Sequence, residues 1–392
     1  MRVLLPEEKS RSGRPSLGDA RGFTLLELLI VLFLTSLLLY SIYQLFDKST
    51  RLYKVQDDMV TMQANIRFAL EQLRTDVKNA GFQASPNTLS DSAVCPKPPS
   101  IHRAIRLEHN PIFSGKFDNK NPYVIPVSIY LWGDIRIGQS FFTEYVTGNT
   151  VKIKGDFTDE EFARIFTIDS FLRLVNHDQY EMVYKITSVS ASARTVTLDG
   201  NPPIVSDLQP CGVDGLGENQ LANVIDYVRY RIIFDPADTT NKRTLLVREY
   251  LKQDGTTVRD RGVTVIADNV VDLQVYDFVF DSDLTRKLPV LDRSKSKLED
   301  VLDDGDDGIL GKDNGSSGDP APENLRFFTL VLTVRSDSHD FSLSHEPKKV
   351  QHAPLVSFTT LPKLQGASRV LTVASKMELR SLSVRNLKSG LP

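Results

Sequence analysis

The pattern of apolar and polar residues divides the chain into three successive parts. Residues 28–46 contain no charged side chain, and 19 such positions come close to the roughly 20 that a helix needs to cross a bilayer. Residues 47–81 place apolar side chains at helical spacing, and strand-like alternation begins near residue 123. The pattern predicts an apolar helix, an amphipathic helix and a β-rich domain, in that order.

The amphipathic part predicts a direct continuation of the apolar helix. Its apolar residues step by three or four positions, and neither Gly nor Pro interrupts the chain from Phe23 to Ala80. The stripe consists of Leu52, Val55, Met59, Met62, Ile66, Ala69, Leu73, Val77 and Ala80. Gly81 follows at the position of a C-terminal cap. The stripe favours packing against a globular domain, although the same spacing could serve a coiled coil.

The remaining chain predicts a connection followed by a mostly antiparallel β domain. Proline recurs through residues 82–122, which indicates a connection. In residues 228–234, Val228, Tyr230, Ile232 and Phe234 alternate with Arg229 and Arg231, and residues 326–336 alternate in the same way. Further strands are expected within 123–132, 180–189, 244–251, 270–280 and 376–387. The fold class is therefore α+β, with one long helix packed on a β head over 123–392 and with Trp132 in its core.

Charge and composition narrow the function and set the orientation in the membrane. The 392 residues carry a net charge of -3, and no basic stripe interleaved with aromatic residues indicates nucleic-acid binding. Basic residues outnumber acidic ones before the apolar segment: Arg2, Lys9, Arg11, Arg14 and Arg21 against Glu7, Glu8 and Asp19. Because basic flanks stay cytoplasmic, the residues after Phe46 are expected to face a periplasm.

Both cysteines fall on the side predicted to face the periplasm. There a disulfide between Cys95 and Cys211 can persist, and two cysteines allow only one pairing. Two free thiols are the alternative.

One carboxylate, Glu27, lies at the start of the apolar segment and requires an explanation. A lone carboxylate in a membrane segment costs a few kcal/mol and indicates a partner. A secretory signal would end in a small-x-small cleavage site, which is missing here, and a plain membrane anchor would not need Glu27. Alternatively, Glu27 lies at the headgroup boundary beside Arg21 and extends toward water.

The stretch RGFTLLELLIVLFL, residues 21–34, resembles the class III signal of type IV prepilins and pseudopilins. The resemblance implies that prepilin peptidase removes a cytoplasmic leader, residues 1–22, between Gly22 and Phe23, and that Phe23 is then N-methylated. Residues 23–46 would form the transmembrane and filament-core helix. In that family the carboxylate at the position of Glu27 pairs with the terminal amine of a neighbouring subunit, which sets the axial register of otherwise apolar helices.

The order of segments in the head resembles that of PilW-type minor pilins. The helix end NIRFALEQLRTDVKNAGF is followed by VVDLQVYDFVF, an Asp/Gly-rich insertion, FFTLVLTVRSD and LRSLSVRNL. The resemblance implies a single-pass inner-membrane protein with a periplasmic head, which later reaches the pilus surface and primes assembly at or near the filament tip. Its partners would be other minor pilins, the major pilin and prepilin peptidase, with a tip adhesin as a further candidate.

Two other functions remain open. A J-type pseudopilin of type II secretion resembles this branch but usually has a smaller head, whereas the K type typically lacks the carboxylate. A periplasmic enzyme or receptor with a signal anchor is the remote alternative. Against catalysis, the sequence holds no Gly-x-Ser-x-Gly, His-Glu-x-x-His or phosphate-binding loop.

An acidic, glycine-rich loop, residues 298–319, is the candidate metal site. Its carboxylates, which are hard oxygen ligands suited to calcium, are Asp303, Asp304, Asp306, Asp307 and Asp313. Their spacing does not match an EF-hand, and a solvated acidic loop is the favoured interpretation. His339 and His345 could also hold a metal, although a surface turn is favoured there. No cofactor other than calcium is expected.

Overall fold

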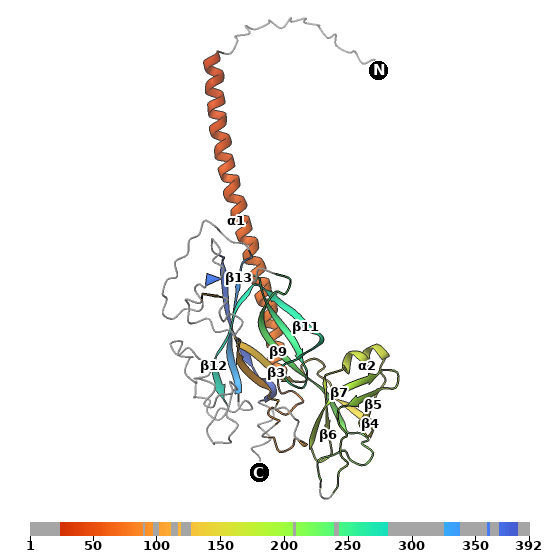
Figure 1. Cartoon of the computed structure of the whole chain (residues 1–392). Helices are drawn as coiled ribbons and strands as arrows, with labels where there is room; N and C mark the ends of the chain where they lie inside the picture. The colour runs from red at the N-terminus through yellow and green to blue at the C-terminus, as the bar shows by residue number, and fades with distance from the viewer. Residues whose placement is uncertain are drawn as a thin grey trace, which may run out of the picture. The chain divides into compact units, whose positions relative to one another are not determined.

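The computed structural model describes residues 24–88, 91–96, 102–110, 117–118, 127–206, 209–238, 243–280, 325–337, 359–360 and 368–382. The chain divides into two compact units, Met1–Asp57 and Asp58–Pro392. The helix α1, Leu25–Asn79, begins in the first unit and ends in the second (Figure 1). The predicted α+β class is confirmed.

Helix α1 is continuous, as the sequence predicts, and Gly81 ends it. Gly81 has a φ of 73°, which glycine adopts without strain, and its N–H donates to the Trp132 carbonyl at 2.7 Å. A Cβ atom there would lie 2.5 Å from the Leu382 side chain. The predicted stripe is buried from Met62 onward, whereas Leu52 is 57% exposed. The head therefore covers only the C-terminal part of the stripe.

The strands and the second helix follow α1 in this order: β1 Ile105–His109, β2 Phe117–Asp118, β3 Val127–Gly133, β4 Phe141–Thr147, β5 Thr150–Lys154, α2 Asp159–Ile165, β6 Phe171–Val175, β7 Glu181–Ser190, β8 Thr195–Leu198, β9 Leu221–Phe234, β10 Thr244–Leu251, β11 Val258–Asp268, β12 Val270–Phe280, β13 Leu325–Arg335, β14 Thr359–Thr360 and β15 Val370–Glu378. Two of them, β1 and β2, fall inside the segment 82–122 that was predicted as a connection. Alternation in β1 buries Ile105 and Leu107, so this short strand adds to the edge of β3.

The longest strand, β9, belongs to two β structures. Its second half, from Asp226 onward, pairs with β3 on one side, and Val228–Phe234 pairs with β10 on the other. This gives an antiparallel sheet in the order β1-β3-β9-β10-β11. Its apolar face, with Val228, Tyr230 and Ile232, packs against α1 in the main core. The predicted alternation in this segment is confirmed.

The first part of β9 closes a small barrel that the sequence analysis did not predict. Going round the barrel the order is β9-β4-β5-β8-β7-β6, and β6 pairs again with β9 through Phe171–Val175 and Leu221–Ile225. The barrel has its own core, which includes Phe162 and Phe166. Helix α2 begins with a capping box, in which Thr158 and Glu161 bond each other's backbone N–H groups. The open sheet and the barrel therefore share strand β9.

A third sheet, in the order β12-β13-β15, completes the main core. Phe328, Leu330 and Leu332 of β13 face this core, as their alternation predicts. The strand expected within 376–387 instead ends at Glu378. Leu379 and Leu382 are both buried at a spacing of three residues, which fits a helical turn rather than a strand.

Two long-range connections fix parts of the head. Asp76 of α1 is buried and accepts hydrogen bonds from Tyr230 Oη and Arg248 Nε, each at 2.6 Å. The structure also contains the predicted disulfide, which joins Cys95 and Cys211 across 116 positions. The first connection holds α1 on its sheet, and the second joins the segment after α1 to the loop that precedes β9.

Candidate assembly site at the start of the helix

Thr24 caps the N-terminus of α1. Its side-chain oxygen accepts a hydrogen bond from the backbone N–H of Glu27 at 3.2 Å, and its carbonyl accepts one from the N–H of Leu28 at 3.2 Å. This is the geometry of an N-cap residue. The spacing Thr-x-x-Glu is the sequence pattern of a capping box. This pattern could have predicted the cap at Thr24, which the sequence analysis did not include.

The cap places the Glu27 carboxylate in the first turn of α1. There the carboxylate is favoured by the positive end of the helix dipole. Glu27 is exposed, and no described residue forms a hydrogen bond or an ion pair with its carboxylate. Gly22 and Phe23, the predicted processing residues, lie outside the described residues. The described part of the chain thus leaves Glu27 available to a group from elsewhere.

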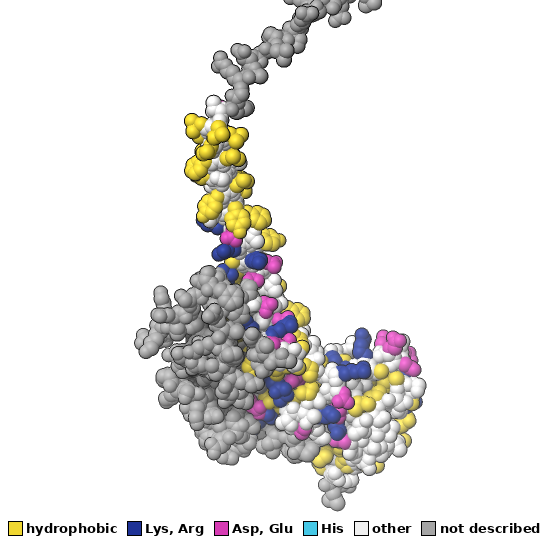
Figure 2. Space-filling view, turned by 45° about the horizontal axis from the view of Figure 1, so that its top comes forward, with side chains coloured by type: hydrophobic (Ala, Val, Ile, Leu, Met, Phe, Trp, Pro, Cys, Tyr) yellow, Lys and Arg dark blue, Asp and Glu magenta, His cyan; other side chains and the backbone are white. Residues whose placement is uncertain are grey.

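The apolar half of α1 satisfies its polar groups internally. Thr35 Oγ1 donates to the Val31 carbonyl at 2.7 Å, and Ser41 Oγ donates to the Leu37 carbonyl at 3.0 Å. Large apolar side chains surround this half, and each is about half exposed or more (Figure 2). Hydrophobic side chains on every face, with hydroxyls bonded to the helix backbone, suit a hydrocarbon environment.

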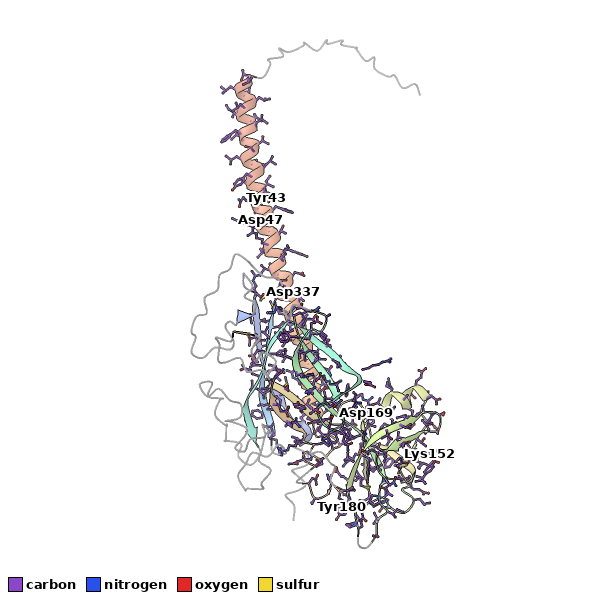
Figure 3. All side chains as sticks on the ribbon, viewed as in Figure 1. Tyr43, Asp47, Lys152, Asp169, Tyr180 and Asp337 are labelled. Carbon is purple, nitrogen blue, oxygen red and sulfur yellow. A yellow bond between two sulfur atoms is a disulfide. The ribbon has the colours of Figure 1, made fainter. Side chains whose placement is uncertain are left out.

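Charged side chains begin again at Asp47, one turn after Tyr43, and Figure 3 labels both residues along α1. Asp47 pairs with Arg51 one turn later, at 3.1 Å. Tyr40 and Tyr43 precede this pair, and aromatic residues of this kind gather at membrane–water boundaries. Among the described residues, helix α1 is the one helix that is long and apolar enough to cross a membrane.

Comparison with known proteins bears on this same segment. Residues 18–41 match the family model of the prokaryotic N-terminal methylation motif. The chain carries the N-terminal signature of the type IV prepilin and pseudopilin superfamily. No curated protein and no solved structure matches this chain. The matched residues include Gly22, Phe23 and Glu27, so the prepilin-type motif coincides with the capped start of α1.

The prepilin-type motif has general consequences for this chain. Proteins with it are structural rather than catalytic, are processed by prepilin peptidase and assemble with pilus or pseudopilus subunits. The motif and the apolar helix together fit a membrane-anchored precursor.

The predicted metal sites lie outside the described residues. This holds for Asp303, Asp304, Asp306, Asp307 and Asp313 of the acidic loop, and for His339 and His345. Among the residues that the structure describes, no group of three or more His, Cys, Asp or Glu side chains could hold a metal ion. Calcium binding by the loop 298–319 stays a prediction.

Proposed function

We propose that this chain is a minor pilin of a type IV pilus, inserted in the inner membrane with its head in the periplasm and later located at or near the filament tip. The observation that carries the proposal is the exposed Glu27 at the capped start of an apolar helix, directly after the predicted cleavage site. Cleavage before Phe23 would create a cationic amine one helical turn from a carboxylate. Pairing between neighbouring subunits then neutralises both charges only when the helices stack in register.

The size of the head supports a place at the end of the filament. Beyond the sheet that packs on α1, the head includes a six-stranded barrel with its own core. A subunit that occurs once at the tip can carry such an addition without repeating it along the filament. The order of its sequence segments, similar to that of PilW-type minor pilins, favours the same place. The partners proposed with it are other minor pilins, the major pilin and a tip adhesin.

A type II secretion pseudopilin of the J type is the second candidate. It shares the processing motif and the carboxylate, and a single complementation experiment separates it from a pilin. A strain that lacks this chain is complemented with the wild type or with Glu27→Val, and surface pili and secreted enzymes are scored in parallel.

The minor-pilin proposal predicts that deletion removes surface pili and leaves enzyme secretion intact. Glu27→Val protein should still be processed and inserted, because valine suits an apolar helix, but piliation should fall toward the level of the deletion. Mass spectrometry of the processed N-terminus serves as the control. Loss of secretion with normal piliation would favour the pseudopilin, and full piliation with Glu27→Val would refute the role of this carboxylate.

A further inference from the structure

Basic side chains return on α1 directly after its apolar half. Residues 28–46 carry no charged side chain, and Lys48, Arg51 and Lys54 follow within the next eight positions. Figure 2 shows charged side chains succeeding the apolar ones along this helix. Because a spacing of three residues places side chains on the same side of a helix, these three residues form one short basic stripe, the boundary cations.

Two of the boundary cations have no counter-charge among the described residues. Arg51 is paired, since its Nε lies 3.1 Å from the Asp47 carboxylate. Lys48 and Lys54 are exposed, and neither ammonium group forms an ion pair or a hydrogen bond with a described residue. An anion from outside the chain can therefore reach both.

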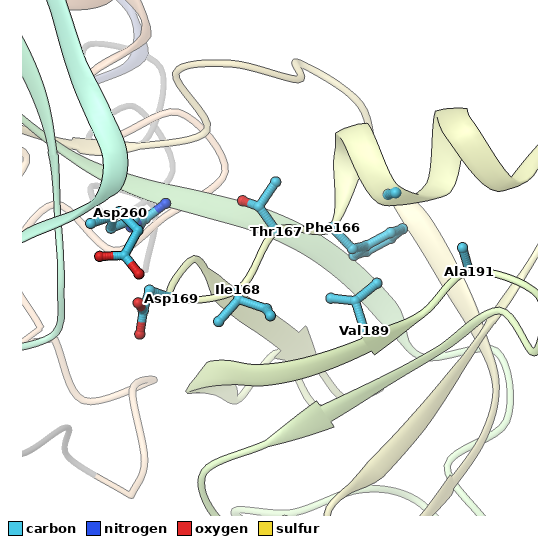
Figure 4. Close-up of a pocket in the computed structure, with 9 residues that line it drawn as sticks. Phe166, Thr167, Ile168, Asp169, Val189, Ala191 and Asp260 are labelled. Carbon is cyan, nitrogen blue, oxygen red and sulfur yellow. The ribbon is translucent and has the colours of Figure 1, made fainter.

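Two charged residues that line the pocket beside α2, which Figure 4 shows, are by contrast already matched. Asp169 lies 3.5 Å from Lys252 Nζ. Arg259 places its Nη1 2.7 Å from the buried Asp226 carboxylate. The ammonium groups of the boundary cations lack such compensation, so they are the better candidates for a charged ligand.

The rise of α1 places the boundary cations in the headgroup layer of a membrane. With the hydrocarbon boundary at Phe46, a rise of 1.5 Å per residue puts the Cα atoms of Lys48 and Arg51 about 3 Å and about 8 Å beyond it. The polar layer of one leaflet is about 5–8 Å thick, since a bilayer measures about 40–45 Å around a hydrocarbon core of about 30 Å. Lys48 and Arg51 therefore begin at the level of the lipid phosphates.

The direction of helical side chains brings Lys54 to the same level. Its Cα atom lies about 12 Å beyond Phe46. Side chains on a helix lean toward its N-terminus, which for these residues is the membrane side. The flexible apolar stem of a lysine can follow that direction while its ammonium group stays in the polar layer.

Two exposed tyrosines lie on the hydrocarbon side of the boundary cations. The Tyr40 hydroxyl accepts a hydrogen bond from Gln44 Nε2 at 2.9 Å, so its own proton can be donated to a lipid oxygen. Tyr43 follows one turn later, and tyrosines of this kind gather at the headgroup level. Tyrosines and cations together suit a surface of phosphate groups.

Membrane orientation does not explain the boundary cations. In the expected orientation the residues after Phe46 face the periplasm, and basic residues near a span favour the cytoplasm instead. Three cations on the periplasmic flank weaken the orientation signal of the N-terminal basic residues. They therefore indicate a role other than orientation.

We propose that Lys48, Arg51 and Lys54 bind the phosphate groups of anionic lipids in the outer leaflet of the inner membrane and so set the depth of α1 before assembly. This inference rests on the membrane insertion contained in the proposed function, and it is the same for a pilus or a secretion system. With Lys48 at the outer phosphates, the 21 positions back to Glu27 span roughly 32 Å, close to the hydrocarbon thickness of about 30 Å. Glu27 and the predicted cleavage site then lie at the cytoplasmic boundary, within reach of a peptidase that cuts on that side.

Lipid retention by the full chain tests the proposal. The chain is reconstituted in nanodiscs of equal parts phosphatidylcholine and phosphatidylglycerol with the same acyl chains, and native mass spectrometry counts the lipids of each kind that stay bound. The double variant Lys48→Gln with Lys54→Gln removes the two unpaired charges. Lys48→Arg with Lys54→Arg keeps them, and Lys152→Gln with Lys154→Gln removes two lysines from the barrel strand β5 instead.

The wild type should retain phosphatidylglycerol in preference to phosphatidylcholine. Lys48→Gln with Lys54→Gln should lower the ratio of the two bound lipids about tenfold or more, because each basic residue near an anionic surface contributes to binding. The arginine variant and the barrel variant should keep the wild-type ratio. High salt should lower the ratio of the wild type, since salt screens exposed charges.

An unchanged ratio in Lys48→Gln with Lys54→Gln, or an equal loss in the barrel variant, would overturn the proposal. Loss of surface pili by Lys48→Gln with Lys54→Gln at an unchanged lipid ratio would also overturn it, and would assign these cations to an acidic surface of a neighbouring subunit. A chain that does not enter nanodiscs would refute the membrane insertion itself, whereas an inserted chain without lipid preference would refute only this inference.

Discussion

His102 illustrates at the scale of one residue how burial removes a charge. Its imidazole stacks on the Trp132 ring with centroids 4.2 Å apart, and Phe171 and Tyr227 contact its edges. Burial, aided by the nearby Arg106 guanidinium, lowers the pKa of His102 from 6.5 to about 3. The folded protein therefore keeps this ring neutral at pH values where the unfolded chain protonates it.

This shift predicts a dependence of stability on pH. Between pH 6.5 and about 3 the unfolded state binds one more proton at His102 than the folded state does, so the free energy of unfolding falls as the pH falls. Titration of His102 changes the free energy of unfolding by at most about 1.4 kcal/mol for each pH unit. The variant His102→Phe keeps an aromatic ring on Trp132 and should show a shallower dependence.

Urea unfolding at pH 4.5, 5.5 and 6.5, followed by the fluorescence of Trp132, the single tryptophan, measures this difference. Carboxyl groups also titrate in this range, but they do so in both proteins. The difference between the wild-type and His102→Phe curves removes their contribution. Parallel pH curves for His102→Phe and the wild type would contradict the prediction.

At the scale of elements, Asp76 joins α1 to the sheet. Burial raises the pKa of Asp76, while the Arg248 guanidinium and the hydroxyl of Tyr230 oppose that rise. The Arg248 ion pair has both side chains largely buried, 12% and 2% exposed. In sequence, Asp76 lies between Leu73 and Val77 of the apolar stripe, and the sequence analysis gave it no role. Its partners come from β9 and β10, far along the chain, and no local pattern could name them.

Removing only one member of this pair should destabilise the head strongly. Arg248→Met leaves the Asp76 carboxylate buried without its cation, at a cost of about 3 kcal/mol or more. The double variant Asp76→Leu with Arg248→Met should recover much of that loss, because no uncompensated charge remains. Thermal unfolding of the four proteins gives the double-mutant cycle.

The surface pair Glu71 and Arg74 on the same helix provides the control. Both side chains are more than half exposed, and their cycle should give little coupling. Equal coupling for the surface pair and the buried pair would refute a special role for Asp76.

At the scale of the whole molecule, the disulfide constrains the head. Cys95 follows α1, Cys211 precedes β9, and the bond closes a loop across 116 positions. In the chain-entropy model such a loop stabilises by restricting the unfolded state. The segment beside Cys95 also pairs with β7, since the Cys95 N–H donates to the Glu181 carbonyl at 2.9 Å.

Replacing both cysteines with alanine should lower the free energy of unfolding by about 2–4 kcal/mol. Reductant should lower the melting temperature of the wild type toward that of the variant and leave the variant unchanged. Melting curves that do not respond to reductant in the wild type would contradict a stabilising role for the bond.

The sequence by itself determined the features that rest on local periodicity. Spacing of three and four predicted α1 and the face that packs from Met62 onward, and alternation predicted which residues of β9 and β13 face the core. The motif around Glu27 was equally local, because processing and methylation depend on a short stretch of chain. Each of these signals lies within a few neighbouring residues.

Only the tertiary structure decided how β9 divides its two ends between a barrel and an open sheet. Barrel closure depends on backbone pairing between strands whose partner residues lie about 50 positions apart, such as Arg173 and Asn223, and backbone groups are the same in every residue. The partners of Asp76 follow from the same long-range pairing. Residue patterns fix which face of an element is buried, whereas the choice of neighbour depends on how the whole chain packs.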